Sequence, residues 1–423
     1  VCESDEQRYY NWQFRKNLVW NLGLRLESEY VPSFLGDQNK AVNFGFYDKI
    51  APRVGVAYDP TGSGNSKFSL GYMVAYDITK GNLPISAFGA EKWLRCFYPL
   101  DNPNVLEIEK GDPKKAFECQ NLRVPANDLV DPALKPMQQR MLSIGYERNL
   151  SGNLLFSIYA INKHMVRAVE DVGRLVVNNG VIEEQYTITN PGEGRSVDPS
   201  WFPAGLPSPI TPRAKRDYKA FEFGLEKRSS AYFASGNYTL GRLWGNYSGL
   251  ASSDERGRID PNTNRDYDLP HTSKDKDSKD VFGRLATDRP HVFKFLGWKT
   301  FSARRYGNID LGTSFIWQSG TPLSTQVPIL TSAPAFSYGR GNMGRTPSFS
   351  ETSLNYGHEF TLPEFNENQK IRIEWTVSNL FNQKTIVDKE TWLVHPNDGH
   401  IFFSSTASVF KGYDPVRLMK EQE

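Results

Sequence analysis

Few residues of this 423-residue chain are spaced for chemistry. Gly339, Gly341 and Gly344 satisfy the pattern G-x-G-x-x-G. That pattern binds a dinucleotide only when a strand precedes it and a helix N-terminus follows it. Here Arg345-Thr346-Pro347 follows, and then a predicted strand, so no helix dipole would face a phosphate. We therefore interpret this stretch as a loop and predict no cofactor.

The histidines and serines form no catalytic pattern either. His395 and His400, with Asp398 between them, are the only histidine cluster, and either a metal or haem contact or plain solvation would explain them. The serines lack the strand–turn–helix context of a nucleophile elbow. We predict no catalytic residue, no cofactor-binding residue and no metal ligand, and hence no enzyme. A hydrolase stays an alternative, because a triad assembled in space leaves no sequence trace.

Three cysteines are present. Cys96 and Cys119 fall in the same long polar segment, and they could form a disulfide in an oxidising compartment. Only their proximity in sequence connects them, and a bridge also needs a suitable Cα separation. Both the bridged and the free state are open at this point. Cys2 has no evident partner.

Candidate ligand-binding residues lie in the long polar segments. Aromatic side chains there could stack on a sugar or an aromatic chelate, and basic ones in the charge-rich stretch Asp254–Asp288 could contact a ligand. Packing between loops and simple solvation are the competing interpretations. The candidates are Trp93, Trp201, Phe202, Arg256, Arg258 and Arg265.

The elements that must position these residues alternate apolar and polar side chains. In Leu18–Glu27 the leucines and Trp20 fall on one face, and Asn21, Gly23 and Arg25 on the other. Period two over this length predicts a strand. The same pattern recurs in Arg53–Tyr58, Phe68–Asp77, Leu142–Glu147, Phe221–Glu226, Ile309–Trp317 and Ile371–Ser378. Less regular strands are predicted at Leu154–His164, Tyr232–Gly249, Pro290–Phe301 and Thr352–Phe360.

Short and long connections alternate between these strands. The short ones are Asp59–Asn65, Leu150–Asn153, Arg228–Ala231, Phe301–Tyr306 and Leu362–Asn368. The long ones are Val31–Ile50, Ile78–Met137, Arg167–Arg216, Leu250–Asp288, Ser319–Phe349 and the segment from Asn382 onward. If strands run up and down, all short links fall at one end. This arrangement is typical of an outer-membrane β-barrel, with short periplasmic turns and long extracellular loops.

Composition agrees with this interpretation. No stretch of about 18 apolar residues could form a membrane-spanning helix. The 26 Phe, 20 Tyr and 9 Trp could supply interfacial aromatic girdles. A net charge of +2 does not indicate binding to nucleic acid. A soluble β-sandwich also alternates, and a secreted glycan-binding protein stays an alternative, but loops this long are unusual in a compact domain.

Both ends of the chain suggest a fragment. Val1–Glu6 is polar and is no signal peptide. Tyr10, Trp12 and Phe14 alternate like the tail of an earlier strand. At the other end, no strand returns after Lys370–Leu380. Because an open edge in lipid is costly, we expect a closing strand, and everything before Val1, to be missing.

Seven segments, in order along nearly the whole chain, resemble one family. They are Asn17–Glu27, Ala51–Pro60, Gly245–Glu255, Asp260–Arg265, Thr287–His291, Gly339–Pro347 and Asn379–Gln383. The family is the TonB-dependent outer-membrane receptors, in particular the Oar-like group. The resemblance implies an all-β, antiparallel transmembrane β-barrel of twenty-two strands. Residues 1–423 would form about its C-terminal half, without the plug and the last strand.

The resemblance also implies a function. We expect part of a receptor or transporter in the bacterial outer membrane, for an unidentified ligand such as an iron chelate, cobalamin or a glycan. Its partners would be outer-membrane lipid, lipopolysaccharide and that small ligand, with no nucleic acid. TonB, ExbB and ExbD would act only through the missing N-terminal plug. The alternative is a structural or adhesive barrel that binds partners through its long loops without energised uptake.

Overall fold

The computed structural model describes most of the chain. The described residues are 2–33, 42–79, 87–88, 93–98, 118–123, 128–150, 153–178, 181–201, 210–249, 252–255, 265–269, 271–304, 307–328, 334–361, 370–393 and 412–422. Within them, no helix is long and apolar enough to cross a membrane.

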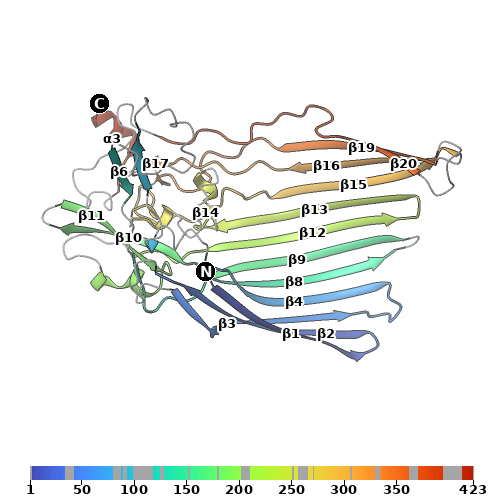
Figure 1. Ribbon diagram of the computed structural model, residues 1–423, viewed down its shortest axis with the longest axis horizontal. Coiled ribbons are helices and arrows are strands. Elements are labelled where there is room, and N and C mark those ends of the chain that lie inside the picture. The colour runs from blue at the N-terminus through green and yellow to red at the C-terminus, as the bar shows by residue number, and fades with distance from the viewer. Residues whose placement is uncertain are drawn as a thin grey trace.

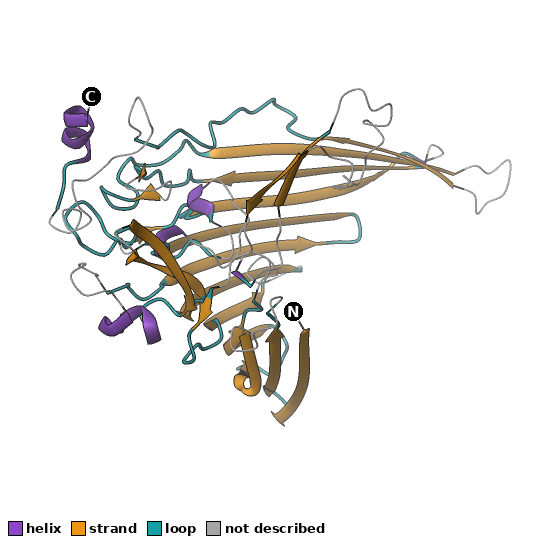
Figure 2. Cartoon of the chain, turned by 60° about the vertical axis from the view of Figure 1, so that its left-hand side comes forward, coloured by secondary structure: helices purple, strands orange, loops and turns teal. Residues whose placement is uncertain are grey.

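One large antiparallel sheet dominates the structure, and each strand in its path pairs with the next one along the chain (Figure 1). The path consists of β1 (Cys2–Arg15), β2 (Leu18–Val31), β3 (Val42–Tyr58), β4 (Ser66–Tyr76), β8 (Gln138–Asn149), β9 (Leu154–Arg167), β12 (Arg216–Arg228), β13 (Tyr232–Gly245), β15 (His291–Ser302), β16 (Asn308–Gln318), β19 (Phe349–Thr361) and β20 (Lys370–Val377). The short β14 (Gly283–Arg284) pairs with β13 beside this path. The sheet is curved and open, with β1 and β20 at its edges, so it is a partial barrel (Figure 2).

The two ends of the sheet differ as the connector lengths predict. Tight turns lie at one end, and the long connections gather at the other, which we call the loop end (Figure 1). The loop end carries β5 (Trp93–Phe97), β6 (Glu118–Arg123), β7 (Leu129–Val130), β10 (Glu170–Asn178), β11 (Val181–Thr189), β17 (Val327–Pro328), β18 (Pro334–Ala335) and the helix α3 (Pro415–Gln422). The predicted link Leu362–Asn368 lies outside the described residues, but β19 and β20 pair antiparallel up to Thr361 and Lys370 on either side of it.

The turn after β3 shows why these links are short. The Asp59 carboxylate accepts hydrogen bonds from the backbone N–H of Gly64 at 2.6 Å and of Thr61 at 3.0 Å. Gly62 and Gly64 have φ of 67° and 76°, a conformation that glycine adopts without strain. The hydrogen bonds, that from Gly64 most strongly, lower the pKa of Asp59. The turn therefore closes on its own side chain.

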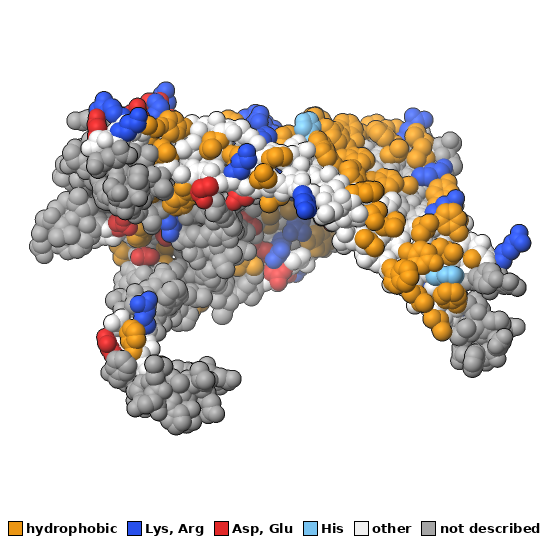
Figure 3. All heavy atoms as spheres, turned by 90° about the horizontal axis from the view of Figure 1, so that it is seen from above, with side chains coloured by type: hydrophobic (Ala, Val, Ile, Leu, Met, Phe, Trp, Pro, Cys, Tyr) orange, Lys and Arg blue, Asp and Glu red, His pale blue; other side chains and the backbone are white. Residues whose placement is uncertain are grey.

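The face predicted to be apolar is exposed along most strands. Leu22, Leu70, Ile144, Phe221 and Trp375 are among its large side chains, and each is at least 40% exposed. Figure 3 shows hydrophobic side chains gathered over one face of the strands. The strands of the path have 8 to 17 residues, and a tilted strand crosses the hydrocarbon core with about 9–11. This face is the one that lipid covers in an outer-membrane barrel.

The opposite face, the inner wall, is polar and closely fitted. A Cβ at Gly145 of β8 would lie 2.4 Å from Cε1 of Tyr159 in β9, so glycine leaves the space for that ring. The Tyr159 hydroxyl donates to the carboxylate of Glu147, which also pairs with Lys67 at 2.7 Å. Small residues and ion pairs thus line the concave side, as suits a water-filled lumen.

Two strand predictions are corrected in extent. The segment with Tyr10, Trp12 and Phe14 is a whole strand, because β1 pairs with β2 from Cys2 onward. The predicted link Val31–Ile50 is shorter, since β3 already begins at Val42. In β1 the residues Asp5–Arg8 are polar on both faces, so backbone pairing rather than apolar alternation defines that part of the strand. In β3, Val42, Phe44 and Phe46 continue the apolar alternation toward the loop end.

Candidate ligand-contact sites on the inner wall and at the loop end

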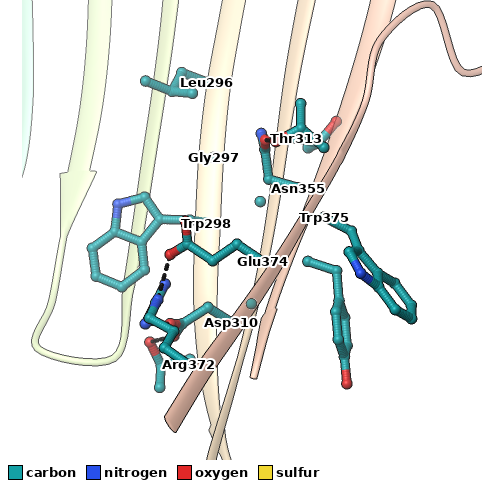
Figure 4. Close-up of a pocket in the computed structure, with 14 residues that line it drawn as sticks. Leu296, Gly297, Trp298, Asp310, Thr313, Asn355, Arg372, Glu374 and Trp375 are labelled. Carbon is teal, nitrogen blue, oxygen red and sulfur yellow. Dashed lines mark hydrogen bonds and ion pairs between the residues drawn. The ribbon is translucent and has the colours of Figure 1, made fainter. Parts of the chain in front are cut away.

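A recess of about 540 Å³ lies on the inner wall over β15, β16, β19 and β20 (Figure 4). Arg372 of β20 is one of the residues that line it. Its Nη1 lies 2.8 Å from Oδ2 of Asp310, and its Nε donates to the carboxylate of Glu374. Thr300 Oγ1 donates to the other oxygen of Asp310 at 2.6 Å. The guanidinium is therefore shared between two carboxylates.

The chemistry of this recess follows from those pairs. Two carboxylates and one arginine leave an excess of negative charge, so the recess is not built to hold an anion. Leu296 and Trp298 add an exposed apolar surface beside it. The alternation in β16 and β20 already puts Asp310, Arg372 and Glu374 on the polar face, and only their pairing across β19 is new from the structure. Such a surface suits contact with a neutral or basic group inside the lumen.

A second group of charges lies on β2 and β3, and it is buried. Lys49 has no exposed side-chain surface, and its Nζ lies 2.6 Å from Glu29 and 3.9 Å from Glu27. The other oxygen of Glu29 accepts the backbone N–H of Thr79 at 2.7 Å. Buried charges are tolerated when they are paired and hydrogen-bonded in this way. We assign these residues to holding the connection after β4 against the wall.

At the loop end, Arg340 connects three segments that are far apart in sequence. Its guanidinium, 1% exposed, lies 2.8 Å from Asp254 and 2.6 Å from Asp266, and it stacks 4.0 Å from the centroid of the Phe336 ring. Burial alone would lower the pKa of Arg340, but the two carboxylates raise it above its ordinary value. The interpretation of this charged loop as simply solvated is therefore wrong for Asp254 and Asp266.

Arg345 forms a second connection at the same end. Its Nη1 donates to the carbonyl oxygens of Asp288 at 2.8 Å and Gly320 at 2.9 Å, and its Nη2 donates to the Asp288 carboxylate. Asp288 also accepts the backbone N–H of Leu243 at 2.6 Å. Two of the family-like segments, Thr287–His291 and Gly339–Pro347, thus meet in space, and sequence alone did not predict that contact.

The glycine motif is part of this connection. Gly339, Gly341 and Gly344 all have positive φ, between 76° and 80°, and serve turns around the two arginines. The element that follows them directly is the strand β19, which begins at Phe349, and not a helix. The interpretation as a loop therefore fits the structure.

The loop end has a hydrophobic core of its own. It includes Phe88, Val172, Ile188, Tyr247 and Tyr267, which come from different connections. Burial raises the pKa of both tyrosines well above the ordinary value. The connections that contribute to this core therefore pack against one another.

The predicted contact residues fall in different places. Trp201 is 7% exposed in this core, with the Arg174 guanidinium 5.0 Å from its ring centroid, so packing describes it. Arg265 lies half-buried in a short 3-10 turn, Arg265–Tyr267. The side chains of Trp93, Phe202, Arg256 and Arg258 lie outside the described residues, as do His395 and His400.

Cys96 and Cys119 face one another in the two-stranded sheet of β5 and β6. Their sulfur atoms are bonded in the structure, and their Cα atoms are 4.1 Å apart. Among the described residues, no group of three or more His, Cys, Asp or Glu is placed to hold a metal ion.

Comparison with known proteins decides the family. The profile for the Outer membrane beta barrel domain matches residues 34–369. The chain belongs to this family. It is also 25% identical over 399 residues to the TonB-dependent transporter Oar of Myxococcus xanthus, covering 88% of this chain and 35% of that protein. The predicted resemblance to the Oar-like group, the all-β barrel fold and the bacterial outer membrane as location are thereby confirmed.

Similar solved structures are longer than this chain, and one of them supports the fold. The outer membrane transporter YddB from Escherichia coli superimposes with a TM-score of 0.50 at 12% identity, over 94% of this chain and 43% of that one. The FrpB iron transporter from Neisseria meningitidis (F3-3 variant) superimposes with a TM-score of 0.48 at 11% identity, over 90% of this chain and 41% of that one. The outer-membrane barrel chain described here therefore spans less than half the length of these proteins.

Proposed function

We propose that this chain forms part of the wall and the outer loops of an outer-membrane receptor that takes up a ligand with energy from TonB. One observation carries the proposal. Every described tight turn that joins two neighbouring strands of the long antiparallel sheet lies at one end of it, the sheet has an exposed apolar face, and packed loops lie at the other end. A barrel so oriented presents its loops to the outside and its polar wall to the lumen.

The inner wall supports a role in uptake. Part of its charge is paired within the wall, as in Arg372 with Asp310 and Glu374, so a ligand that enters the lumen meets neutralised polar groups at this recess. Movement of a plug, driven by TonB, ExbB and ExbD, would open this path. The whole of residues 1–423 would then serve as one barrel segment, with Arg265 as the predicted ligand contact that is still half-exposed.

The proposal is tested by uptake in the source bacterium. Strains with and without the gene, each with and without TonB, are supplied with labelled ferric siderophore, cyanocobalamin and maltodextrin. We expect the uptake of one class to fall both on loss of the gene and on loss of TonB. If no uptake depends on the gene while the protein still reaches the outer membrane, the adhesive or structural alternative replaces transport.

A further inference from the structure

A second recess, the loop-end recess, lies among three connections and has a volume of about 310 Å³. Its walls include Ser253, Asp254, Gln326 and Trp392. Backbone hydrogen bonds hold two of its walls together. The carbonyl oxygen of Gln326 accepts the N–H of Leu393 at 2.8 Å, and the backbone N–H of Gln326 donates to the carbonyl oxygen of Thr391 at 3.0 Å. The ion pair between Arg340 and Asp254 secures the opposite wall. The recess is thus a formed site at the end where the loops gather.

Two polar atoms at this recess have no partner in the described part of the chain. Gln326 is 4% exposed, and its Nε2 donates to the carbonyl oxygen of Asp254 at 2.5 Å. The amide cannot be turned over, since two oxygens would then face each other. Its Oε1 is left without a donor, and so is Oγ of Ser253. Buried polar groups are normally satisfied, so each such atom needs an explanation.

The lining indicates which chemistry would satisfy them. Hydroxyl groups of Thr321, Ser324 and Thr391 accompany the free amide oxygen. Trp392, 37% exposed, offers a flat apolar surface whose body can stack on a ring. The charged lining consists of Asp254, already paired with Arg340, and the adjacent Asp388 and Lys389. No excess of positive charge is available for an anionic chelate.

We propose that the loop-end recess binds one neutral sugar residue of a glycan. The apolar face of the sugar ring lies against Trp392, and sugar hydroxyls bond to Gln326 Oε1 and Ser253 Oγ after a small rotation of those side chains. A volume of about 310 Å³ is at the lower end of the roughly 300–1,000 Å³ typical of ligand pockets, which suits one ring rather than a whole chelate. The inference rests on the proposed function, because the recess must face the outside to meet a glycan.

The test uses the protein expressed from its complete gene and purified from outer membranes in detergent. This protein is applied to an array of neutral oligosaccharides that also carries sialylated and phosphorylated glycans. The affinity for the strongest neutral ligand is then measured by calorimetry for wild type and variants. We expect Trp392→Ala and Ser253→Ala to weaken binding at least tenfold. Tyr338→Ala is the matched control, because Tyr338 is 36% exposed at the same end but does not line the recess.

Three results would overturn the sugar site: no neutral glycan bound, charged glycans bound in preference, or Trp392→Ala binding like wild type. Gln326→Met is a further variant, because methionine has nearly the size of glutamine but no amide group. Near-ultraviolet circular dichroism of each variant checks that it is folded. Cell fractionation is done on the same cultures. A protein that reaches the outer membrane but binds no neutral glycan contradicts the sugar site alone, whereas one absent from that membrane contradicts the proposed function.

Discussion

Replacement of Arg340 by leucine should open the loop end and leave the sheet intact. The substitution removes the only described cation that contacts both Asp254 and Asp266, whose side chains are 6% and 8% exposed. Breaking a buried ion pair by removal of one partner costs about 3–5 kcal/mol. The twelve long strands do not use Arg340, because their backbone pairing is independent of it.

The expected effect can be stated as an opening equilibrium. Since about 1.4 kcal/mol is a factor of ten, a loss of 3–5 kcal/mol raises the open population of this assembly by roughly two to three and a half orders of magnitude. Hydrogen–deuterium exchange with mass spectrometry measures it directly. Amides in 265–269 and 339–345 should lose protection in Arg340→Leu, and amides in β12 and β13 should not.

Two variants sharpen this experiment. Arg417→Leu removes an exposed arginine of α3 whose i,i+4 pair with Glu421 is worth less than about 1 kcal/mol, so exchange should stay unchanged. Adding Asp254→Asn to Arg340→Leu should restore part of the protection, because it removes a buried charge that Arg340 no longer compensates. Unchanged exchange at 265–269 in Arg340→Leu would refute the role assigned to this ion pair.

Three further predictions concern the wall, a turn and the disulfide. Gly145→Ala should lower stability by about 1–3 kcal/mol through overpacking, seen as a lower temperature of heat modifiability on gels, while Gly236→Ala, with its nearest neighbour at 4.0 Å, should not. Because the pKa of Asp59 is lowered in the folded protein, its carboxylate stabilises the turn at pH values above the ordinary pKa of 3.8, and this contribution is lost as the pH falls through the lower pKa of the folded state. The amide chemical shifts of the turn should follow that titration in the wild type and should not change with pH in Asp59→Asn. Reduction should add two hydrogens to the peptides joined by Cys96 and Cys119, and an unchanged mass would exclude the bridge.

Strands whose two sides face lipid and lumen could be predicted from sequence. In β2 and β16, contact with lipid requires apolar side chains at every second position, so apolar and polar residues alternate over most of each strand. In β15 the alternation is blurred, because Leu296 and Trp298 lie on the inner wall beside the Arg372 recess. The turn sites were also evident, since Gly, Asp and Asn at those positions have local reasons to turn.

The loop end could be predicted only in outline. Arg340 meets carboxylates 74 and 86 positions away, and no local pattern encodes such a contact. Trp201 was a reasonable candidate for ligand contact until its packing in the loop core was seen. The residues of the loop-end recess were not identified from sequence, because Gln326 and Ser253 are notable only for hydrogen bonds they lack in the folded chain.

The most direct test of the account is the orientation of the sheet in the membrane. Epitope tags are inserted singly into the turn at Ser63 and into the loop at Asp277, both exposed in the structure, and intact cells are probed with antibody. We predict that the tag at Asp277 is labelled on intact cells and the tag at Ser63 only after the outer membrane is permeabilised. Labelling of the Ser63 tag on intact cells, or of neither tag before permeabilisation, would contradict the account.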